Sequence, residues 1–511
     1  MSARPNGVDS QPSNNLRARR IALDTHDQPV ILTRRDCPVC RSEGFSAHAR
    51  VRVQNGNHRI IATLYQIDSD WLGPGEAGLS ESAWRRLQIN EGAEVHLSHP
   101  QPLNSLSLVR GRIWGRRFTR QALKEIITDV AGGRYADIHI AMLLTVMATA
   151  GLDEGEVTAL TDAMIGAGDT LKWGREPIVD KHCVGGLPGN RTTPLVVAII
   201  AACGLWMPKT SSRAITSPAG TADTMETLAP VDLDLKAMRR VVEREGGCVV
   251  WGGAVRLSPV DDMLIRVARV MDLDAEAQLV ASVLSKKIAA GSSHLVLDLP
   301  FGPTAKIRQR TEAEELGQRL KSVAEHFGLA TRVLITDGSA PVGRGIGPAL
   351  EARDIIAVLG NHANAPADLR ERALMLSGEL LELAGAAAAG EGHGLAEKTL
   401  ASGAAAAKFE AICSAQGGMR KPPSSRRQYV ILAKQAGVVK EMDNRRLSRV
   451  AKLAGAPGAP AAGIELHCRL GDSIEREQPV YTIHADSTGE LNYAREYAFS
   501  NGDIIAISAS D

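Results

Sequence analysis

The periodicity of hydrophobic positions changes along the chain and divides it into regions. Up to about Val109, short apolar stretches such as residues 51–53 and 60–65 alternate with polar residues, Pro and Gly. Strands of a half-buried sheet have this alternation, so the pattern predicts a small β-rich domain over residues 21–110. Residues 1–20 are polar and lack the apolar core of a signal peptide, which predicts a disordered tail.

Helical spacing replaces this alternation after the β-rich region. Apolar residues recur at intervals of three and four through residues 122–130, 138–147 and 157–165. This spacing predicts three helices in a helical lobe over residues 117–170. A later apolar stretch, residues 259–290, also has helical spacing, and we expect it to return to the same lobe.

The longest region alternates short apolar strands with helices. It predicts an α/β domain over residues 171–258 and 291–420, with a central, mostly parallel sheet. Its strand-like runs are residues 249–251, 295–298 and 332–337. A strand-and-helix pattern resumes over residues 425–511 and predicts a small C-terminal α+β domain. The expected fold class is therefore α/β, with a helical lobe and two smaller flanking domains.

Composition and charge limit the classes of function. With 511 residues, a formal net charge of +1 and 44% hydrophobic content, the chain is expected to be a multidomain globular protein without general attraction for nucleic acid or membranes. The longest apolar run, residues 195–207, is too short to span a bilayer. Of seven cysteines only Cys37 and Cys40 lie close in sequence, so we expect no disulfide framework and a cytoplasmic protein. These two cysteines are half of a zinc knuckle, which His48 or His58 would have to complete, and a β-turn with two free thiols is the preferred interpretation.

Two polar loops flank the apolar run, which itself predicts a buried helix. The first loop, residues 180–193, contains Lys181 as a point charge and glycines that let backbone N–H groups face an anion. The second loop, residues 209–223, repeats this composition with hydroxyl residues around Arg213. We interpret the pair as a catalytic centre that binds an anion. The alternative is that the hydroxyls serve only as turn and cap residues for the backbone.

Three ordered motifs make this interpretation more specific. Residues 180–186 read DKHCVGG, residues 211–226 read SSRAITSPAGTADTME, and residues 281–287 read ASVLSKK. In this order they resemble the phosphate loop, the signature and the base-side helix of the thymidine phosphorylase family, the pyrimidine-type nucleoside phosphorylases. The resemblance extends from about residue 117 to the C-terminus. The N-terminal domain and residues 343–351 (GRGIGPALE) resemble the longer branch of that family, which includes AMP phosphorylases and proteins named as thymidine phosphorylases.

The resemblance implies phosphorolysis: thymidine and phosphate would give thymine and 2-deoxyribose 1-phosphate. Phosphate attacks the anomeric carbon of the sugar, so it is a co-substrate, and no cofactor or metal ion is expected. The implied partners are small molecules and a second copy of the chain, in a homodimer or larger homo-oligomer. The transition state places positive charge on the sugar and negative charge on the base, which a bound dianion and a proton donor or cation would stabilise.

The resemblance also implies roles for individual positions. The phosphate would be bound by Lys181, Cys183, Gly185, Gly186, Thr192, Thr193, Ser211, Thr221 and Lys287. The nucleoside or nucleotide would be bound by Ser212, Arg213, Ala214, Ile215, Thr216, Ser217, Ser282, Lys286 and Lys306. Asp274 matches the proton donor of the AMP phosphorylases, and His182 or Lys286 could instead neutralise the leaving base.

Three other functions stay open at this point. The substrate could be a nucleoside 5′-monophosphate, giving ribose 1,5-bisphosphate, with Arg213, Thr216 and Ser217 on the 5′-phosphate. The chain could transfer a phosphoribosyl group, as the similarly built anthranilate phosphoribosyltransferases do, although we identify no metal-binding carboxylates for that reaction. It could also bind a nucleotide as a regulator without catalysis.

Overall fold

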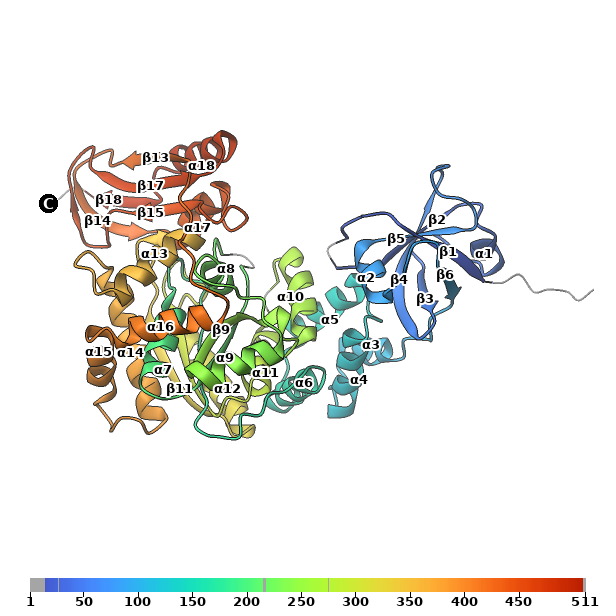
Figure 1. The fold of residues 1–511 in the computed structure, drawn as a ribbon, viewed down its shortest axis with the longest axis horizontal. Helices are drawn as coiled ribbons and strands as arrows, with labels where there is room; N and C mark the ends of the chain where they lie inside the picture. The colour runs from blue at the N-terminus through green and yellow to red at the C-terminus, as the bar shows by residue number, and fades with distance from the viewer. Residues whose placement is uncertain (1–13, 26, 215–216, 274, 509–511) are drawn as a thin grey trace, which may run out of the picture. The chain divides into compact units, whose positions relative to one another are not determined.

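The computed structural model describes residues 14–25, 27–214, 217–273 and 275–508 of the chain (Figure 1). Three predicted site residues, Ile215, Thr216 and Asp274, lie outside these ranges, as do residues 1–13 of the expected tail. The chain forms two compact units. One consists of residues 1–110 and 129–139, and the other of residues 111–128 and 140–511.

The first unit is built around a closed barrel, which has six strands in the described part of the chain. They are β1 (Asn15–Arg20), β2 (Val30–Arg34), β3 (Arg50–Asn55), β4 (His58–Ile67), β5 (Glu76–Leu79) and β6 (Glu94–Ser98), in the order β1-β5-β2-β4-β3-β6. Side chains alternate between the interior and the surface, as in β3, where Val51 and Val53 are fully buried. The β-rich pattern of the sequence corresponds to this barrel.

Two segments of the barrel correct expectations from the sequence. The disordered tail predicted over residues 1–20 is too long, since residues 15–20 form β1, with Leu16 and Ala18 inside the barrel between outward-facing arginines. Residues 37–40 are predicted as a β-turn with two free thiols. Both thiols are free and buried, but the segment begins the helix α1 (Pro38–Ser42), because proline is well suited to the first turn of a helix.

The second unit contains a parallel sheet flanked by helices. Its strands are β7 (Val179–Cys183), β8 (Met207–Ser211), β9 (Gly247–Trp251), β10 (His294–Phe301) and β11 (Ala330–Asp337). β10 pairs in parallel with β7 and β11, and β8 pairs in parallel with β9. The α/β class with a mostly parallel central sheet is therefore confirmed.

The sheet opens between β7 and β8. The two strands are joined near their amino ends by a bridge between Ile178 and Trp206 and by a hydrogen bond from Val179 N to Trp206 O (2.9 Å). The strand pairings of the described residues contain no further ladder between them. Because ligands of parallel sheets bind at the carboxyl ends of strands, the opening marks a place for a site, and both polar loops begin there.

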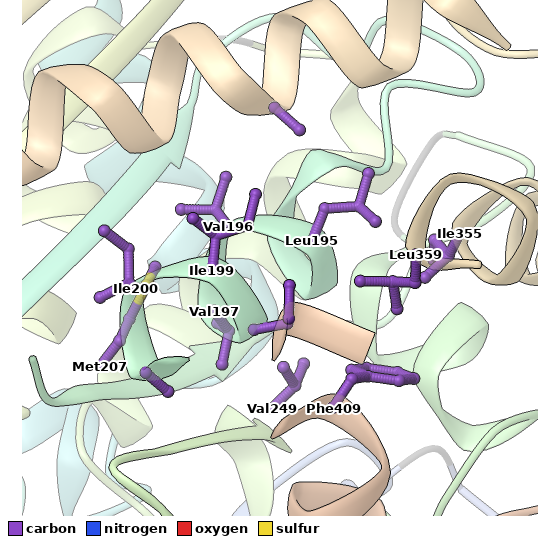
Figure 2. Packing of buried hydrophobic residues seen from close by; sticks show 14 of the residues in the cluster. Leu195, Val196, Val197, Ile199, Ile200, Met207, Val249, Ile355, Leu359 and Phe409 are labelled. Carbon is purple, nitrogen blue, oxygen red and sulfur yellow. The ribbon is translucent and has the colours of Figure 1, made fainter. Parts of the chain in front are cut away.

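A buried helix joins the two polar loops, as the sequence predicts. α7 (Thr192–Ala202) packs against α14 (Ala367–Leu383) and α16 (Ala404–Ala415). Figure 2 shows its apolar side chains surrounded by residues of other elements, among them Met207 and Phe409. A helix that is apolar on all sides is stable only inside a core, which fixes both of its flanking loops.

Further helices pack against the barrel, the parallel sheet or the C-terminal sheets, and the C-terminal region has a hydrophobic core of its own. The helices are α2 (Glu81–Leu87), α3 (Ser105–Ile113), α4 (Arg120–Ala131), α5 (Asp137–Ala150), α6 (Glu154–Gly166), α8 (Thr221–Glu226), α9 (Leu235–Glu245), α10 (Pro259–Met271), α11 (Glu276–Ala289), α12 (Arg310–His326), α13 (Pro348–Leu359), α15 (Gly392–Ala401), α17 (Asn444–Leu453) and α18 (Thr488–Ser500). The remaining strands are β12 (Gly345–Ile346), β13 (Arg427–Leu432), β14 (Gly437–Met442), β15 (Gly463–Leu466), β16 (Ser473–Ile474), β17 (Pro479–Ala485) and β18 (Ile505–Ser508), in two small sheets. α11 packs against α6. Among the described residues, no helix combines the length and apolar character needed to cross a membrane.

Candidate active site

The two polar loops line one cavity of about 330 Å³, which we name the loop cavity. The first loop follows β7 and leads into α7, and the second follows β8 and leads into α8. Since β7 and β8 run in the same direction, their carboxyl ends bring both loops to the same edge of the sheet. The two motifs recognised in the sequence therefore belong to one site.

Three lysines with almost no exposure lie at the opening between β7 and β8. Asp180 on β7 is 3.1 Å from Nζ of Lys209 on β8 and 2.9 Å from Nζ of Lys287 on α11. Lys181 donates from Nζ to the Thr192 hydroxyl (2.6 Å). The exposed fractions are 2% for Lys181, 4% for Lys209 and 2% for Lys287. Buried positive charge is costly without a counter-charge, so this arrangement is suited to receiving an anion.

The protonation of these groups reflects their burial. Burial lowers the pKa of Lys181, and it lowers the pKa of Lys287 to about 7 although the neighbouring Asp180 carboxylate opposes the shift. Burial acts to raise the pKa of Asp180, but Lys209 and Lys287 outweigh it and hold that pKa below its usual value. An anion bound in the loop cavity would favour the charged form of both Lys181 and Lys287.

Close backbone packing fixes the first loop. A Cβ added to Gly185 would lie 2.5 Å from Pro300 Cγ, and one added to Gly189 would lie 2.0 Å from Val342 O. Gly189 also has φ +70°, a conformation that other residues rarely adopt. Larger residues at these two positions would displace the loop from the end of the sheet.

Arg191 connects the two loops. Its Nε donates to Glu351 Oε2 (2.7 Å), its Nη1 to the Thr221 hydroxyl (2.9 Å) and its Nη2 to Ala219 O (2.8 Å). Glu351 is 1% exposed and also accepts from the Thr224 hydroxyl (2.8 Å). A planar guanidinium holding three acceptors sets the distance between the loops, which a flexible ammonium could not do.

A second cavity of about 560 Å³ is lined by α10, α11 and α17, and we name it the helix cavity. It shares lining residues with the loop cavity, among them His182 and Lys286, so the two form one continuous cleft. The Lys286 Nζ lies 2.6 Å from Asp261 Oδ2 and donates to the Ser282 hydroxyl (3.3 Å). Asp261 is fully buried, so it fixes the ammonium of Lys286 at the junction of the cavities.

Comparison with known proteins assigns this architecture to a family. Family models match in succession: a glycosyl transferase family helical bundle domain at residues 107–168, the a/b domain of that family at residues 175–406, and a pyrimidine nucleoside phosphorylase C-terminal domain at residues 438–502. A protein of Polaromonas sp. (strain JS666 / ATCC BAA-500) is 56% identical over 507 residues, covering 99% of each chain. One of Chelativorans sp. (strain BNC1) is 58% identical over 500 residues, covering 98% of each. Both carry the name "Putative thymidine phosphorylase".

The chain belongs to the pyrimidine nucleoside phosphorylase family. Its fold is also similar to a solved structure of anthranilate phosphoribosyltransferase from Thermus thermophilus, with a TM-score of 0.52 and 20% sequence identity. That similarity covers 60% of this chain and 98% of the other. At this level of identity the similarity shows a shared fold alone.

Most of the residues that the phosphorylase motifs predicted lie along the cleft. The loop cavity is lined by Lys181, Cys183, Thr193, Ser211, Arg213, Thr221 and Lys287, the helix cavity by Ser282, and both by His182, Gly185, Gly186, Ser212, Ser217, Lys286 and Lys306. Thr192 is fully buried and holds Lys181. Ala214 lines neither cavity, and its N–H donates to Asp223.

His182 and Cys183 are uncharged in this environment. Burial, together with the surrounding lysines, holds the pKa of His182 well below its usual range, so its imidazole is neutral near pH 7. Burial raises the pKa of Cys183, whose sulfur accepts a hydrogen bond from Asn190 Nδ2 (3.3 Å). His182 can therefore donate a hydrogen bond to a leaving base but does not carry the positive charge of an imidazolium.

Arg213 is neutralised by acidic partners. Its guanidinium lies 2.5 Å from Glu226 Oε2, 3.4 Å from Asp223 Oδ1 and 3.5 Å from Asp232 Oδ1. It also stacks over the Trp251 ring at 5.0 Å. Three carboxylates already neutralise the positive charge of Arg213, so little of that charge can act on the 5′-phosphate that the sequence suggested as its ligand. These contacts hold the second loop in place instead.

Five residues of the site received no role from the sequence: Asp180, Arg191, Lys209, Asp261 and Glu351. Lys209 could have been recognised, because it is the central residue of a short strand that leads into a hydroxyl-rich loop, as Lys181 is. Glu351 lies 160 positions from Arg191, and no local pattern in the sequence indicates that pair.

Proposed function

We propose that this protein catalyses the phosphorolysis of a pyrimidine nucleoside, converting thymidine and phosphate to thymine and 2-deoxyribose 1-phosphate. The observation that carries the proposal is the group of three buried lysines at the joint of two hydroxyl-rich loops, which matches a small dianion. Relatives named as thymidine phosphorylases support the choice of substrate. Thymidine is neutral, so inorganic phosphate would supply the dianion.

The chemistry follows from the charges along the cleft. Phosphate held by Lys181 and Lys287 would face the sugar and stabilise the positive charge that develops at its anomeric carbon. Lys286, at the junction of the cavities, would stabilise the negative charge on the departing base. The nucleophile arrives already ionised, so we propose that the reaction uses no cofactor and no metal ion.

The proton for the leaving base has two candidate donors. Asp274 matches the donor of the AMP phosphorylases, and it remains a proposal on that basis. His182 is the alternative, as a neutral imidazole that donates an N–H. An Asp274→Asn variant separates them, because it would lose kcat for thymidine only if the carboxyl group delivers the proton.

Base release measured with and without phosphate tests the proposed function. The expected result is thymine and 2-deoxyribose 1-phosphate in equal amounts, formed only when phosphate is present. Binding of thymidine without base release would instead indicate a regulator. Base release from a nucleoside 5′-monophosphate that requires pyrophosphate and a divalent cation, with none from thymidine and phosphate, would indicate phosphoribosyl transfer, and either result would exclude the phosphorylase.

We further propose that the enzyme acts in the cytoplasm as a homodimer or larger homo-oligomer. All seven cysteines are free, which suits a reducing compartment. The resemblance to the family supports the oligomer. Sedimentation of the full chain would test it, with a purely monomeric species as the contradicting result.

A further inference from the structure

Two cysteines in the core of the N-terminal barrel have no role in the proposed reaction. Cys37 directly precedes α1, and Cys40 lies in the first turn of that helix. Their exposed fractions are 0% and 1%, and both thiols are free. Within the described residues, no group of three His, Cys, Asp or Glu side chains could hold a metal ion, so the pair lacks the further ligands of a zinc knuckle. The chemistry of this site is therefore that of two neighbouring thiols.

The backbone fixes the two cysteines on one helical turn. The N–H of Cys37 donates to Arg34 O (3.0 Å), and Cys37 O accepts from the N–H of Arg41 (3.1 Å), which closes the turn around Cys40. Residues three apart in such a turn have Cα atoms about 5 Å apart, within the range that a disulfide spans. The Cys40 sulfur also lies 3.3 Å from the hydroxyl oxygen of Thr33, a fully buried residue of β2. The spacing therefore permits a disulfide within the turn.

The two thiols differ in acidity although both are buried. The pKa of Cys37 is lowered, because the effect of the neighbouring Cys40 thiol is larger than the opposing effect of burial. The backbone N–H groups of Cys40 and Val39, at the start of α1, also favour the thiolate of Cys37. The pKa of Cys40 is raised by Cys37 and by burial. Since the thiolate is the form of cysteine that attacks an oxidant, Cys37 is suited to attack and Cys40 to close the bond.

Burial determines which oxidant can reach the pair. α1 has five residues, of which Pro38, Arg41 and Ser42 are exposed. The sulfurs are therefore covered by one short helix, and a local opening of that helix is enough to uncover them. A peroxide is small enough to enter through such an opening, whereas a bulky disulfide such as oxidised glutathione is not.

We propose that Cys37 and Cys40 form a reversible disulfide when hydrogen peroxide oxidises them. In the first step the Cys37 sulfur attacks one oxygen of the peroxide. An S–O bond forms, the O–O bond breaks, and the other oxygen leaves as hydroxide, which takes up the proton that Cys37 lost. In the second step the Cys40 sulfur attacks the sulfur of Cys37, so that the S–S bond forms, the S–O bond breaks, and hydroxide leaves with the Cys40 proton as water. The thiols are oxidised to a disulfide, and the peroxide is reduced to water.

Mass spectrometry of the full chain tests this proposal, because trypsin releases both cysteines in one peptide, residues 36–41 (DCPVCR). The reduced protein is treated with hydrogen peroxide, and the remaining thiols are then alkylated in denaturant. We expect the peptide to lose two hydrogen atoms and escape alkylation, and to accept two alkyl groups after reduction with dithiothreitol. The matched control is Cys248, a single buried thiol whose pKa is raised by burial, which should be oxidised at least about tenfold more slowly.

Two single variants separate the roles of the thiols. In Cys40→Ser the reaction should stop at the sulfenic acid of Cys37, which dimedone traps. In Cys37→Ser this labelling should fall by about tenfold or more. Equal labelling of the two variants would overturn the proposal.

The wild-type peptide decides the proposal even if the variants do not fold. A peptide that still accepts two alkyl groups at a peroxide concentration that oxidises Cys248 would overturn it. Conversion to sulfinic acid without a disulfide, or faster oxidation by oxidised glutathione than by peroxide, would also overturn it. None of these measurements depends on base release, so they remain decisive if the proposed phosphorolysis is refuted.

Discussion

The loop cavity and the helix cavity both concentrate positive charge, but they do so in opposite environments. Lys181, Lys209 and Lys287 are at most 4% exposed, and the last two pair with the buried Asp180, whereas Arg269 and Arg445 are exposed to water. A charge removed from water interacts strongly with a bound ion, so its loss has a large effect on binding. A charge in water is screened and contributes less to binding. The loop cavity is therefore suited to holding the reacting anion, whereas an exposed charge on the wall of the helix cavity interacts more weakly with a ligand.

The largest effect should follow from removing a buried lysine. Lys181→Met keeps the approximate length of the side chain but deletes the charge that faces the loop cavity. We expect kcat/KM for thymidine to fall by about 10³-fold, the upper range for one electrostatic contact in an active site. Steady-state kinetics with thymidine and phosphate would measure it.

The control for this substitution is Lys236→Ala, at an exposed lysine on α9, which should retain wild-type activity. If kcat/KM for thymidine falls by less than about tenfold in a folded Lys181→Met enzyme, the buried charges of the loop cavity do not act more strongly than the exposed charges of the helix cavity.

The second effect concerns stability. Asp180→Asn would leave Lys209 and Lys287 without their shared counter-charge in a buried site. We expect the free energy of unfolding in phosphate-free buffer to fall by about 3–5 kcal/mol. Added phosphate should restore part of the loss, since it binds only the folded state. Chemical denaturation with and without phosphate would measure both.

Asp162→Asn gives the matched control, because it breaks an exposed ion pair with Arg120. It should cost less than about 1 kcal/mol. Equal losses of unfolding free energy in Asp180→Asn and Asp162→Asn would show that burial does not strengthen the ion pairs of Asp180.

The third effect tests the link between the loops. Replacing Arg191 with Gln removes the contacts to Glu351, Thr221 and Ala219, and we expect kcat/KM to fall by about 30- to 100-fold. Arg191→Lys retains the charge but loses the planar geometry, so it should be almost as defective. Near-normal kinetics of the lysine variant would mean that charge alone is required at this position.

The smallest effect is a dependence on pH. Lys287 must be protonated to hold phosphate, and its pKa is lowered to about 7 by burial. The KM for phosphate, expressed as the dianion, should be constant below that pH and rise above it by up to about tenfold per pH unit. Lys287→Arg stays charged throughout and should flatten the profile. A wild-type profile that is flat up to about pH 9 would contradict the assignment.

The sequence was informative where a local pattern decides the structure. The period-two alternation of Val51 and Val53 indicated a strand of the barrel, and the continuous apolar run of α7 indicated a buried helix. The sequence also predicted that the two loops meet, and they do so because β8 follows α7 and runs parallel to β7, which brings both loops to the same edge of the sheet. Strand β1 was missed because its inward Leu16 and Ala18 are separated by arginines, and the segment resembles a polar tail.

The remainder of the site depends on contacts between distant residues. The sequence shows that Lys286 follows a helical pattern, but it does not show that the fully buried Asp261 neutralises it. Arg213 has the appearance of a phosphate ligand in its loop, and only the folded chain brings Glu226 and Asp232 against it. The wall contributed by α17 also arises from tertiary packing, since Asn444 meets Thr304 across 140 positions.

The most direct test of the central claim is the position of an anion in crystals of the full chain soaked in phosphate. The two loops are expected to hold one phosphate between Lys181, Ser211 and Thr221, within hydrogen-bond distance of side chains from both loops. Phosphate bound elsewhere, with the loop cavity containing only water at a concentration that saturates turnover, would contradict the account.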